Sequence, residues 1–360
     1  MSLIIPILKM LNKKRDITLK DGKKFYNTEL IVEELERLND LDLIKIFMII
    51  GKRRIGKTDY FMELAILNYF INGKKTFWLR NFDVELKEPE FYSNFLNDAF
   101  ALKMIPESTN SDKIKIDKRG VSYEEDLFIQ FQSINTYSNM RGANHPNCNL
   151  MILDEFIGEK RKYPKSCVQG LLSLTKTIFS GREDCYVFCL SNFVSVTNAY
   201  FVGFSIYPEK HKAITTFADK GIMIERCQDT YRCAIIKESK WNNIYKAGNY
   251  GDYESEDEDD LNNFIAKLPK ESEPHDYVIH SNNNFYRVYY NSKKSCYYWK
   301  KDNVRHKDDI YVYDYLKMNG ETKMIPKEVI DFIKITFEVN SVKFDSANTL
   351  FSILDIMYNV

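Results

Sequence analysis

The feature that most constrains the fold is an apolar segment that runs directly into a glycine-rich loop and then into a helical pattern. Residues 44–50 read IKIFMII, and Gly51 to Thr58 read GKRRIGKT, which fits the phosphate-loop pattern GxxxxGK[ST]. A strand feeding such a loop, followed by a helix, places backbone N–H groups around a phosphate. Apolar residues after Thr58 recur at helical spacing and stop at Asn72-Gly73, which is a helix end signal. The alternative, a glycine-rich turn that binds no nucleotide, is the weaker interpretation because the context fits on both sides.

This loop predicts a site for ATP and Mg²⁺. Lys57 can reach the β- and γ-phosphates, and the hydroxyl of Thr58 can ligate Mg²⁺. The predicted ATP-binding residues are Gly51, Lys52, Arg53, Arg54, Ile55, Gly56, Lys57 and Thr58, together with Arg80 at the end of the second predicted strand.

Composition excludes several classes of protein. The 51 basic and 51 acidic residues sum to a formal net charge of zero, which excludes a uniformly basic nucleic-acid coat but not local basic faces. The seven cysteines contain no CxxC pair and predict no zinc site; they fit a reducing cytoplasm. The first residues lack the basic region and cleavage site of a signal peptide, and no apolar run is long enough to span a bilayer. We therefore expect a soluble, intracellular protein with no membrane partner.

The first 200 residues predict an α/β fold. Four short apolar strands, at 44–50, 75–80, 150–153 and 186–191, alternate with helical patterns. Strands that are apolar throughout and separated by helices indicate a parallel sheet covered on both faces. The segment 113–123 predicts a small hairpin with Lys118-Arg119-Gly120 at its tip.

We expect three regions: an ATPase domain at 1–232, a linker region at 233–270 and a smaller domain at 271–360. In the block 252–260, seven of nine residues are acidic, which favours a solvated linker over a clamp for a basic partner. From Tyr277 onward the pattern becomes antiparallel β with asparagine-rich turns, and a helical region begins at Pro326.

Two adjacent carboxylates, Asp154 and Glu155, end the third predicted strand. At the carboxyl end of a strand beside the phosphate loop, Asp154 is expected to hold Mg²⁺. Glu155 is expected to polarise a water for attack on the γ-phosphate. This pair favours an ATPase over a small-molecule kinase, whose nucleophile is the substrate. The alternative is a solvated Asp-Glu that opens a loop.

Three further polar residues are candidates near the γ-phosphate. Asn192, after the fourth strand, is a candidate for sensing hydrolysis and coupling it to motion, or an ordinary turn residue. Arg182 and Arg141 are candidates for an arginine supplied to a neighbouring subunit's site, which can accelerate phosphoryl transfer by about 10³–10⁵; the alternative for each is a surface arginine.

Three segments then resemble a known family. LDEFIGEK (153–160), LLSLTKTIFSGRE (171–183) and CLSNFVSVTNAYF (189–201) are similar to the DNA-encapsidation ATPases of small tailed bacteriophages with protein-primed linear genomes. The GKRRIGKT loop and the FWLRN strand match the same pattern. The resemblance covers about residues 44–205 closely and the rest more loosely.

The resemblance implies a viral DNA-packaging motor related to the large subunit of terminases. Its first domain would have the P-loop fold of the additional-strand, catalytic-Glu type. Its smaller α+β domain would be ribonuclease-H-like and lack nuclease residues. Such proteins form homomeric rings, five-membered in the best-known member, that dock on the portal vertex of the empty capsid in the host cytoplasm. They push double-stranded DNA inside. Ring size and the participation of a structural RNA stay open here.

Carried over by the resemblance, Lys57 and Glu155 are catalytic, Thr58 and Asp154 hold the metal, and Arg182 is the arginine-finger candidate. Arg141 stands where the family carries a basic trans-acting group. The chain departs from the family at Ser180, where relatives can have arginine, and at Asp83, where the family has a basic residue.

The second domain can be compared with an active nuclease, which needs a cluster of carboxylates around two metals. Its first strands, Tyr277–His280 and Phe285–Tyr290, carry no carboxylate, and Asp276 lies at their edge. We therefore expect no nuclease activity. His280 is expected to be a solvated strand residue and not a ligand.

Contacts to DNA in such a motor should be made mainly to phosphates. Lys113, Lys115, Lys118 and Arg119 on the predicted hairpin are candidates, with a basic solvated turn as the alternative. Two other functions stay open: a cellular P-loop helicase or loader, and a nucleotide-dependent scaffold that binds DNA or capsid without turnover.

Overall fold

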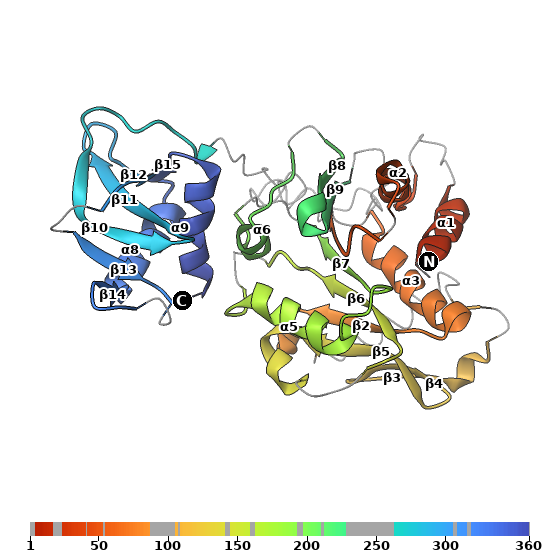
Figure 1. The fold of residues 1–360 in the computed structure, drawn as a ribbon. Helices are drawn as coiled ribbons and strands as arrows, with labels where there is room; N and C mark the ends of the chain where they lie inside the picture. Colours follow the sequence, from red (N-terminus) through yellow and green to blue (C-terminus); the bar gives the residue numbers. More distant parts are fainter. Residues whose placement is uncertain are drawn as a thin grey trace, which may run out of the picture. The chain divides into compact units, whose positions relative to one another are not determined.

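The computed structural model describes residues 4–16, 24–40, 42–52, 55–86, 105–106, 109–140, 145–158, 163–192, 197–209, 212–227, 263–304, 308–314 and 318–359. The chain divides into two compact units (Figure 1). The first contains Met1–Val194 and Pro208–Asp257, and the second contains Ser195–Tyr207 and Glu258–Val360. The acidic block 252–260, and most of the predicted linker, lie outside the described residues.

The first unit is built on a nine-stranded sheet in the order β3-β4-β5-β2-β6-β7-β1-β9-β8. Its strands are β1 (Ile46–Ile50), β2 (Lys75–Arg80), β3 (Ile114–Asp117), β4 (Gly120–Tyr123), β5 (Asp126–Ser133), β6 (Cys148–Asp154), β7 (Tyr186–Ser191), β8 (Ile214–Phe217) and β9 (Ile222–Arg226). The pairs from β5 across to β9 are all parallel, and β3, β4 and β8 pair antiparallel at the edges. The prediction of a mainly parallel α/β sheet is confirmed. The additional strand is β7, which lies between β6 and β1. The sequence missed β5, β8 and β9.

Helix α3 (Lys57–Asn72) follows the phosphate loop as predicted, and it is capped by Gly56 and Gly73, both in the left-handed region. Helices α1 (Ile4–Arg15) and α2 (Glu29–Leu38) belong to the same part of the unit, and α1 packs against both α2 and α3. Their apolar faces share one core with alternate residues of the sheet, among them Phe47, Leu150 and Phe188. All seven residues of β6 are buried, because α5 (Cys167–Phe179) also packs on this strand. A strand buried on both faces cannot alternate polar and apolar residues, which explains its apolar run.

The predicted hairpin at 113–123 is confirmed as β3 and β4. Gly120 is required there: its φ is +145°, and a Cβ at this position would lie 1.8 Å from the carbonyl oxygen of Ile129. Short 3₁₀ helices occur at Asp83–Leu86 (η1), Ser111–Lys113 (η2), Ile134–Met140 (η3) and Ala218–Lys220 (η5).

The second unit has a six-stranded mixed sheet in the order β14-β13-β10-β11-β12-β15. Its strands are β10 (Glu273–Ser281), β11 (Asn284–Asn291), β12 (Cys296–Lys301), β13 (Asp309–Val312), β14 (Thr322–Met324) and β15 (Val342–Phe344). β10, β11 and β12 form an antiparallel meander, and β13 pairs parallel to β10. Helices α8 (Lys327–Glu338) and α9 (Ala347–Asn359) confirm the predicted helical region. The unit also contains α6 (Ala199–Phe204), which packs on α9 although it follows β7 in the chain.

Candidate active site

The phosphate loop lies at the carboxyl end of β1 and is held by both neighbouring strands. The N–H of Gly51 donates to the carbonyl of Ser191, the last residue of β7, at 3.2 Å, and the N–H of Cys227 after β9 donates to the carbonyl of Ile50, at 2.7 Å. A Cβ on Gly51 would lie 2.5 Å from the Cβ of Cys227, so only glycine fits this close approach. The predicted residues Arg53 and Arg54 lie outside the described residues.

Lys57 is the first residue of α3 and is buried. Its Nζ donates to the carbonyl oxygens of Gly51 and Lys52, each at 2.8 Å, and therefore spans the loop. The first N–H groups of α3 and the positive end of the helix dipole lie at the same point. The loop, the lysine and the helix end together supply the N–H groups and positive charge that an anion site needs.

Thr58 and Asp154 meet at this site from different elements. The hydroxyl of Thr58 lies 3.4 Å from Oδ1 of Asp154, the last residue of β6. A threonine hydroxyl and one carboxylate suit Mg²⁺, which prefers few protein ligands together with substrate phosphates and waters. The pKa of Asp154 lies above its ordinary value, chiefly because the group is buried. Arg80, Lys57 and the Thr58 hydroxyl lower the pKa but do not offset the effect of burial. The residues therefore fit the metal that the sequence predicted.

Glu155 follows Asp154 in a left-handed backbone conformation, with φ of +56°. This turn ends the strand and leaves 54% of the Glu155 side chain exposed, next to the buried Asp154. The carboxamide of Asn81, which follows β2, donates to the carbonyls of Glu155 and Phe156, both at 3.1 Å. Asn81 thus fixes the turn. No sequence pattern predicted this role for Asn81, although it ends the FWLRN segment.

Arg80 joins the two carboxylates. Its Nη2 lies 2.8 Å from Asp154 Oδ2, and its Nη1 lies 2.6 Å from Glu155 Oε2. Burial lowers the pKa of the guanidinium, but Asp154 and Glu155 outweigh that effect, so the pKa lies above its ordinary value. The charge of a third carboxyl group, Glu85 in η1, also raises the pKa of Arg80. Burial raises the pKa of Glu85 itself. The structure therefore places Arg80 beside the carboxylates as well as near the nucleotide site.

Asn192 lies directly after β7, between the strands that carry the loop and Asp154. The prediction that Asn192 faces the γ-phosphate depends on β7 lying between β6 and β1, and this strand order is confirmed. The sensing function itself stays a prediction.

Arg182 lies at the amino ends of the strands, at the opposite end of β6 from Asp154. Its guanidinium donates to the carbonyls of His145, Pro146 and Cys148, at the amino end of β6, and to those of Ile178 and Phe179. Asp154 is at the other end of β6, and a seven-residue strand spans about 20 Å. The structure therefore does not bring Arg182 to the site of its own chain, and its action on a neighbour stays a prediction. Arg141 lies outside the described residues.

The four basic candidates for DNA contact are exposed on or beside the β3–β4 hairpin. Lys113 pairs with Glu124 and Arg119 pairs with Asp117. The charges of Lys113 and Arg119 are thus partly offset by these carboxylates. Contact with DNA stays a prediction for all four residues, Lys113, Lys115, Lys118 and Arg119.

A buried carboxyl group, Glu225, was missed by the sequence analysis. It lies on β9 beside Ile49 of β1 and is 1% exposed. Burial raises its pKa to about 8, although a hydrogen bond from the Tyr26 hydroxyl, at 2.9 Å, and the charge of Lys57 lower it. The N–H of Tyr26 also donates to the carbonyl of Ile55 in the phosphate loop, at 3.3 Å. The sequence signal for this group is a short apolar run, Ile222 to Ile224, that ends in the glutamate.

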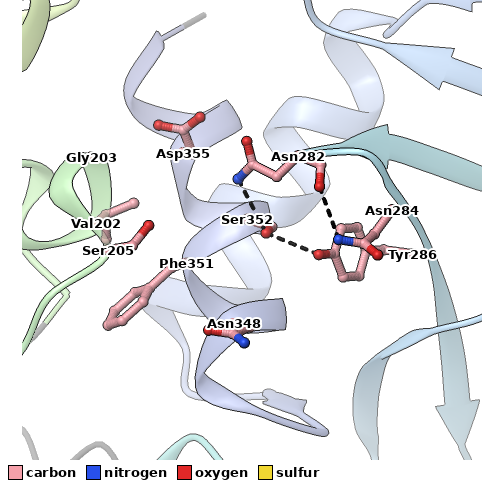
Figure 2. Close-up of a pocket in the computed structure, with 10 residues that line it drawn as sticks. All are labelled: Val202, Gly203, Ser205, Asn282, Asn284, Tyr286, Asn348, Phe351, Ser352 and Asp355. Carbon is pink, nitrogen blue, oxygen red and sulfur yellow. Dashed lines mark hydrogen bonds between the residues drawn. The ribbon is translucent and has the colours of Figure 1, made fainter. Parts of the chain in front are cut away.

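The second unit contains a polar pocket of about 300 Å³ (Figure 2). The hydroxyl of Ser352 accepts hydrogen bonds from Asn282, at 3.3 Å, and from the Tyr286 hydroxyl, at 3.0 Å. Asp355 is the one carboxylate among its lining residues, and it accepts a hydrogen bond from Tyr313 at 2.8 Å. In the part of the chain that the structure describes, no three His, Cys, Asp or Glu residues are grouped as metal ligands.

Two other charged or polar residues of this unit have structural partners. Arg287 is fully buried and pairs with Asp302 and Asp308. The ring of His280 stacks on Phe285, with centroids 4.6 Å apart. These contacts are structural ones that stabilise the second unit.

Comparisons with known proteins agree with this geometry. The family model of the Podovirus DNA encapsidation protein (Gp16) matches residues 23–350. The DNA packaging proteins of Bacillus phage PZA and Bacillus phage phi29 are each 27% identical over 257 residues, covering 70% of this chain and 71% of the relative.

Two solved structures share the fold. The Phi-28 gp11 DNA packaging motor matches with a TM-score of 0.73 at 17% identity, over 90% of this chain and 96% of that one. The bacteriophage Phi-29 viral genome packaging motor assembly matches with a TM-score of 0.60 at 21% identity, over 90% of this chain and 95% of that one.

No described helix is long and apolar enough to cross a membrane.

Proposed function

The chain belongs to the podovirus DNA encapsidation protein family and is a bacteriophage DNA packaging ATPase, and from this premise we propose how its site works. ATP hydrolysis at the phosphate loop drives double-stranded DNA through the portal into a preformed capsid. One observation carries the proposal. The carboxyl ends of the parallel strands bring together four residues: Lys57, Thr58, Asp154 and Glu155.

The residues divide the chemistry between them. Lys57 and the N–H groups at the start of α3 bind the phosphates, and Thr58 and Asp154 would hold Mg²⁺. Bound Mg²⁺ would offset the charge on the β- and γ-phosphate oxygens. Glu155, exposed and next to the buried Asp154, orients a water and accepts its proton. Arg80 holds both carboxylates in place, and Asn81 fixes the turn between them.

We propose further that the protein acts as a ring docked on the portal vertex, in the host cytoplasm. Arg182 or Arg141 of one subunit then completes the site of the next. Mixing Glu155→Gln subunits with Arg182→Ala subunits tests this step. If the arginine acts across the interface, some mixed interfaces regain an intact site, and hydrolysis exceeds that of either variant alone. Activity no greater than that of the two variants measured separately would overturn the assignment for Arg182.

We also propose that the second domain is ribonuclease-H-like and has no nuclease activity. Support comes from its side chains: the pocket in Figure 2 offers carboxamides, hydroxyls and the single carboxylate Asp355. Two-metal nucleases hold their ions with several carboxylates. Incubation of the protein with linear DNA and Mg²⁺ or Mn²⁺ should leave the DNA intact.

The decisive experiment adds purified protein to empty capsids, DNA and ATP, and scores nuclease-protected DNA, with and without a structural RNA. Wild type should protect DNA. Glu155→Gln should bind ATP but lose hydrolysis and protection. A helicase or loader would unwind DNA without protecting it. A scaffold would give wild-type ATPase activity no greater than that of Glu155→Gln. Either result would overturn the motor assignment.

A further inference from the structure

We propose that Arg15, the last residue of α1, contacts the α- and β-phosphates of the nucleotide in the phosphate loop. This inference rests on the proposed nucleotide site and adds a residue to it. Helix α1 covers Ile4–Arg15 and precedes residue 23, where the match to the family model begins. Arg15 therefore lies outside the matched residues.

Arg15 is held in place by α3. Its Nε and Nη2 donate to Oε2 of Glu63, at 3.3 and 3.0 Å, and its Cζ lies 5.2 Å from the centre of the Tyr60 ring. Glu63 is 3% exposed, and Arg15 is 14% exposed. A guanidinium fixed along one edge and stacked on a ring loses little further freedom when it binds a second group.

The remaining edge of the guanidinium faces the phosphate loop. A Cβ built on Gly56, the cap of α3, would lie 3.9 Å from Nη1 of Arg15. In the described part of the chain no acceptor takes a hydrogen bond from Nη1. The N–H groups around this glycine belong to the part of a phosphate loop that cradles the α- and β-phosphates. Nη1 is thus close to the place where these phosphates bind.

The charges next to Gly56 balance. Glu63 is paired with two cations, Lys14 and Arg15, and a second carboxylate, Asp59, has its Oδ2 3.8 Å from the Cβ built on Gly56. Lys14 is 53% exposed, whereas Arg15 is mostly buried. Of these two cations, Arg15 is the one shielded from water, so its charge would act on the phosphates with less screening than that of Lys14.

The test measures equilibrium binding of ATP and ADP by the full-length chain and by Arg15→Met, Arg15→Lys and Lys14→Met. Loss of a charge-assisted hydrogen bond should weaken ATP and ADP binding by Arg15→Met about 10- to 100-fold. Arg15→Lys should be intermediate, because lysine cannot hold Glu63 and reach the phosphates together. Lys14→Met removes the other partner of Glu63 and should stay within about twofold of wild type.

Two results would overturn the inference. One is ATP affinity of Arg15→Met equal to that of Lys14→Met, with both variants equally less resistant to heat, since Arg15 would then only stabilise the fold. The other is weakened ATP binding with unchanged ADP binding, which would place the contact elsewhere than the α- and β-phosphates. Failure of the nucleotide site itself is distinguishable: wild type would then bind ATP no better than Lys57→Ala.

Discussion

Arg80, the last residue of β2, holds Asp154, the last residue of the neighbouring strand β6, with 2.8 Å between Nη2 and Oδ2. The two side chains are 13% and 5% exposed. The same guanidinium holds Glu155, so one arginine orients both carboxylates of the site.

Removing this arginine should affect both stability and activity. Arg80→Ala leaves Asp154 buried without its partner and should lower the free energy of unfolding by about 3–5 kcal/mol. Arg80→Lys keeps the charge but cannot bond both carboxylates, so ATPase activity should fall more than stability. Urea unfolding and steady-state ATPase assays measure the two effects. In an Asp154→Asn background Arg80→Ala should cost less; an equal cost would show that the two residues are not coupled.

Gly51 should be intolerant of a side chain because of Cys227. Gly51→Ala would place a Cβ 2.5 Å from the Cβ of Cys227, and overpacking of this kind costs about 1–3 kcal/mol. The displaced loop should also bind ATP more weakly. Cys227→Gly removes the opposing atom, so the double variant should recover part of the lost stability and affinity. Additive losses in the double variant would refute this explanation.

Glu225 should make stability depend on pH. Its pKa is raised from 4.5 to about 8, chiefly by burial, so the folded state retains a proton that the unfolded state releases. Stability should therefore fall as pH rises from about 5 to about 8, by up to about 1.4 kcal/mol per pH unit. Glu225→Gln should remove this part of the dependence and be relatively more stable at pH 8. Thermal unfolding of both proteins across this range measures the difference, and parallel curves would contradict the assignment.

Arg182 should contribute to stability whatever else it does. Arg182→Ala leaves the carbonyls of His145, Pro146, Cys148, Ile178 and Phe179 without their charged donor, which should cost about 2–4 kcal/mol. Arg119→Ala is the matched control, because the Arg119 side chain is exposed and, within the described residues, forms an ion pair with Asp117 alone; it should change stability by less than about 0.5 kcal/mol. Chemical unfolding of the two variants should separate them. Equal, small effects would mean that the Arg182 contacts are not maintained in solution.

Local sequence determined the parts of this protein whose signal lies within a few residues. The run 44–58 predicted strand, loop and helix, and 150–155 predicted a buried strand ending in two carboxylates. Both predictions are confirmed, since apolar runs, glycine positions and helical spacing act locally. The hairpin at 113–123 was predictable for the same reason.

Only the tertiary structure decided which distant residues share the site. Arg80 and Asp154 are 74 residues apart, and Tyr26 and Glu225 are 199 apart, so no local pattern could pair them. Strand order paired the first two by placing β2 beside β6. The second pair also needs Tyr26 to be held on the phosphate loop, through its N–H bond to Ile55, beside the neighbouring strand β9. The same order put Arg182 at the amino end of the strands, away from the phosphates. Sequence alone therefore identified the chemistry of the phosphate loop, whereas packing of the sheet and its helices decided which charges act on it.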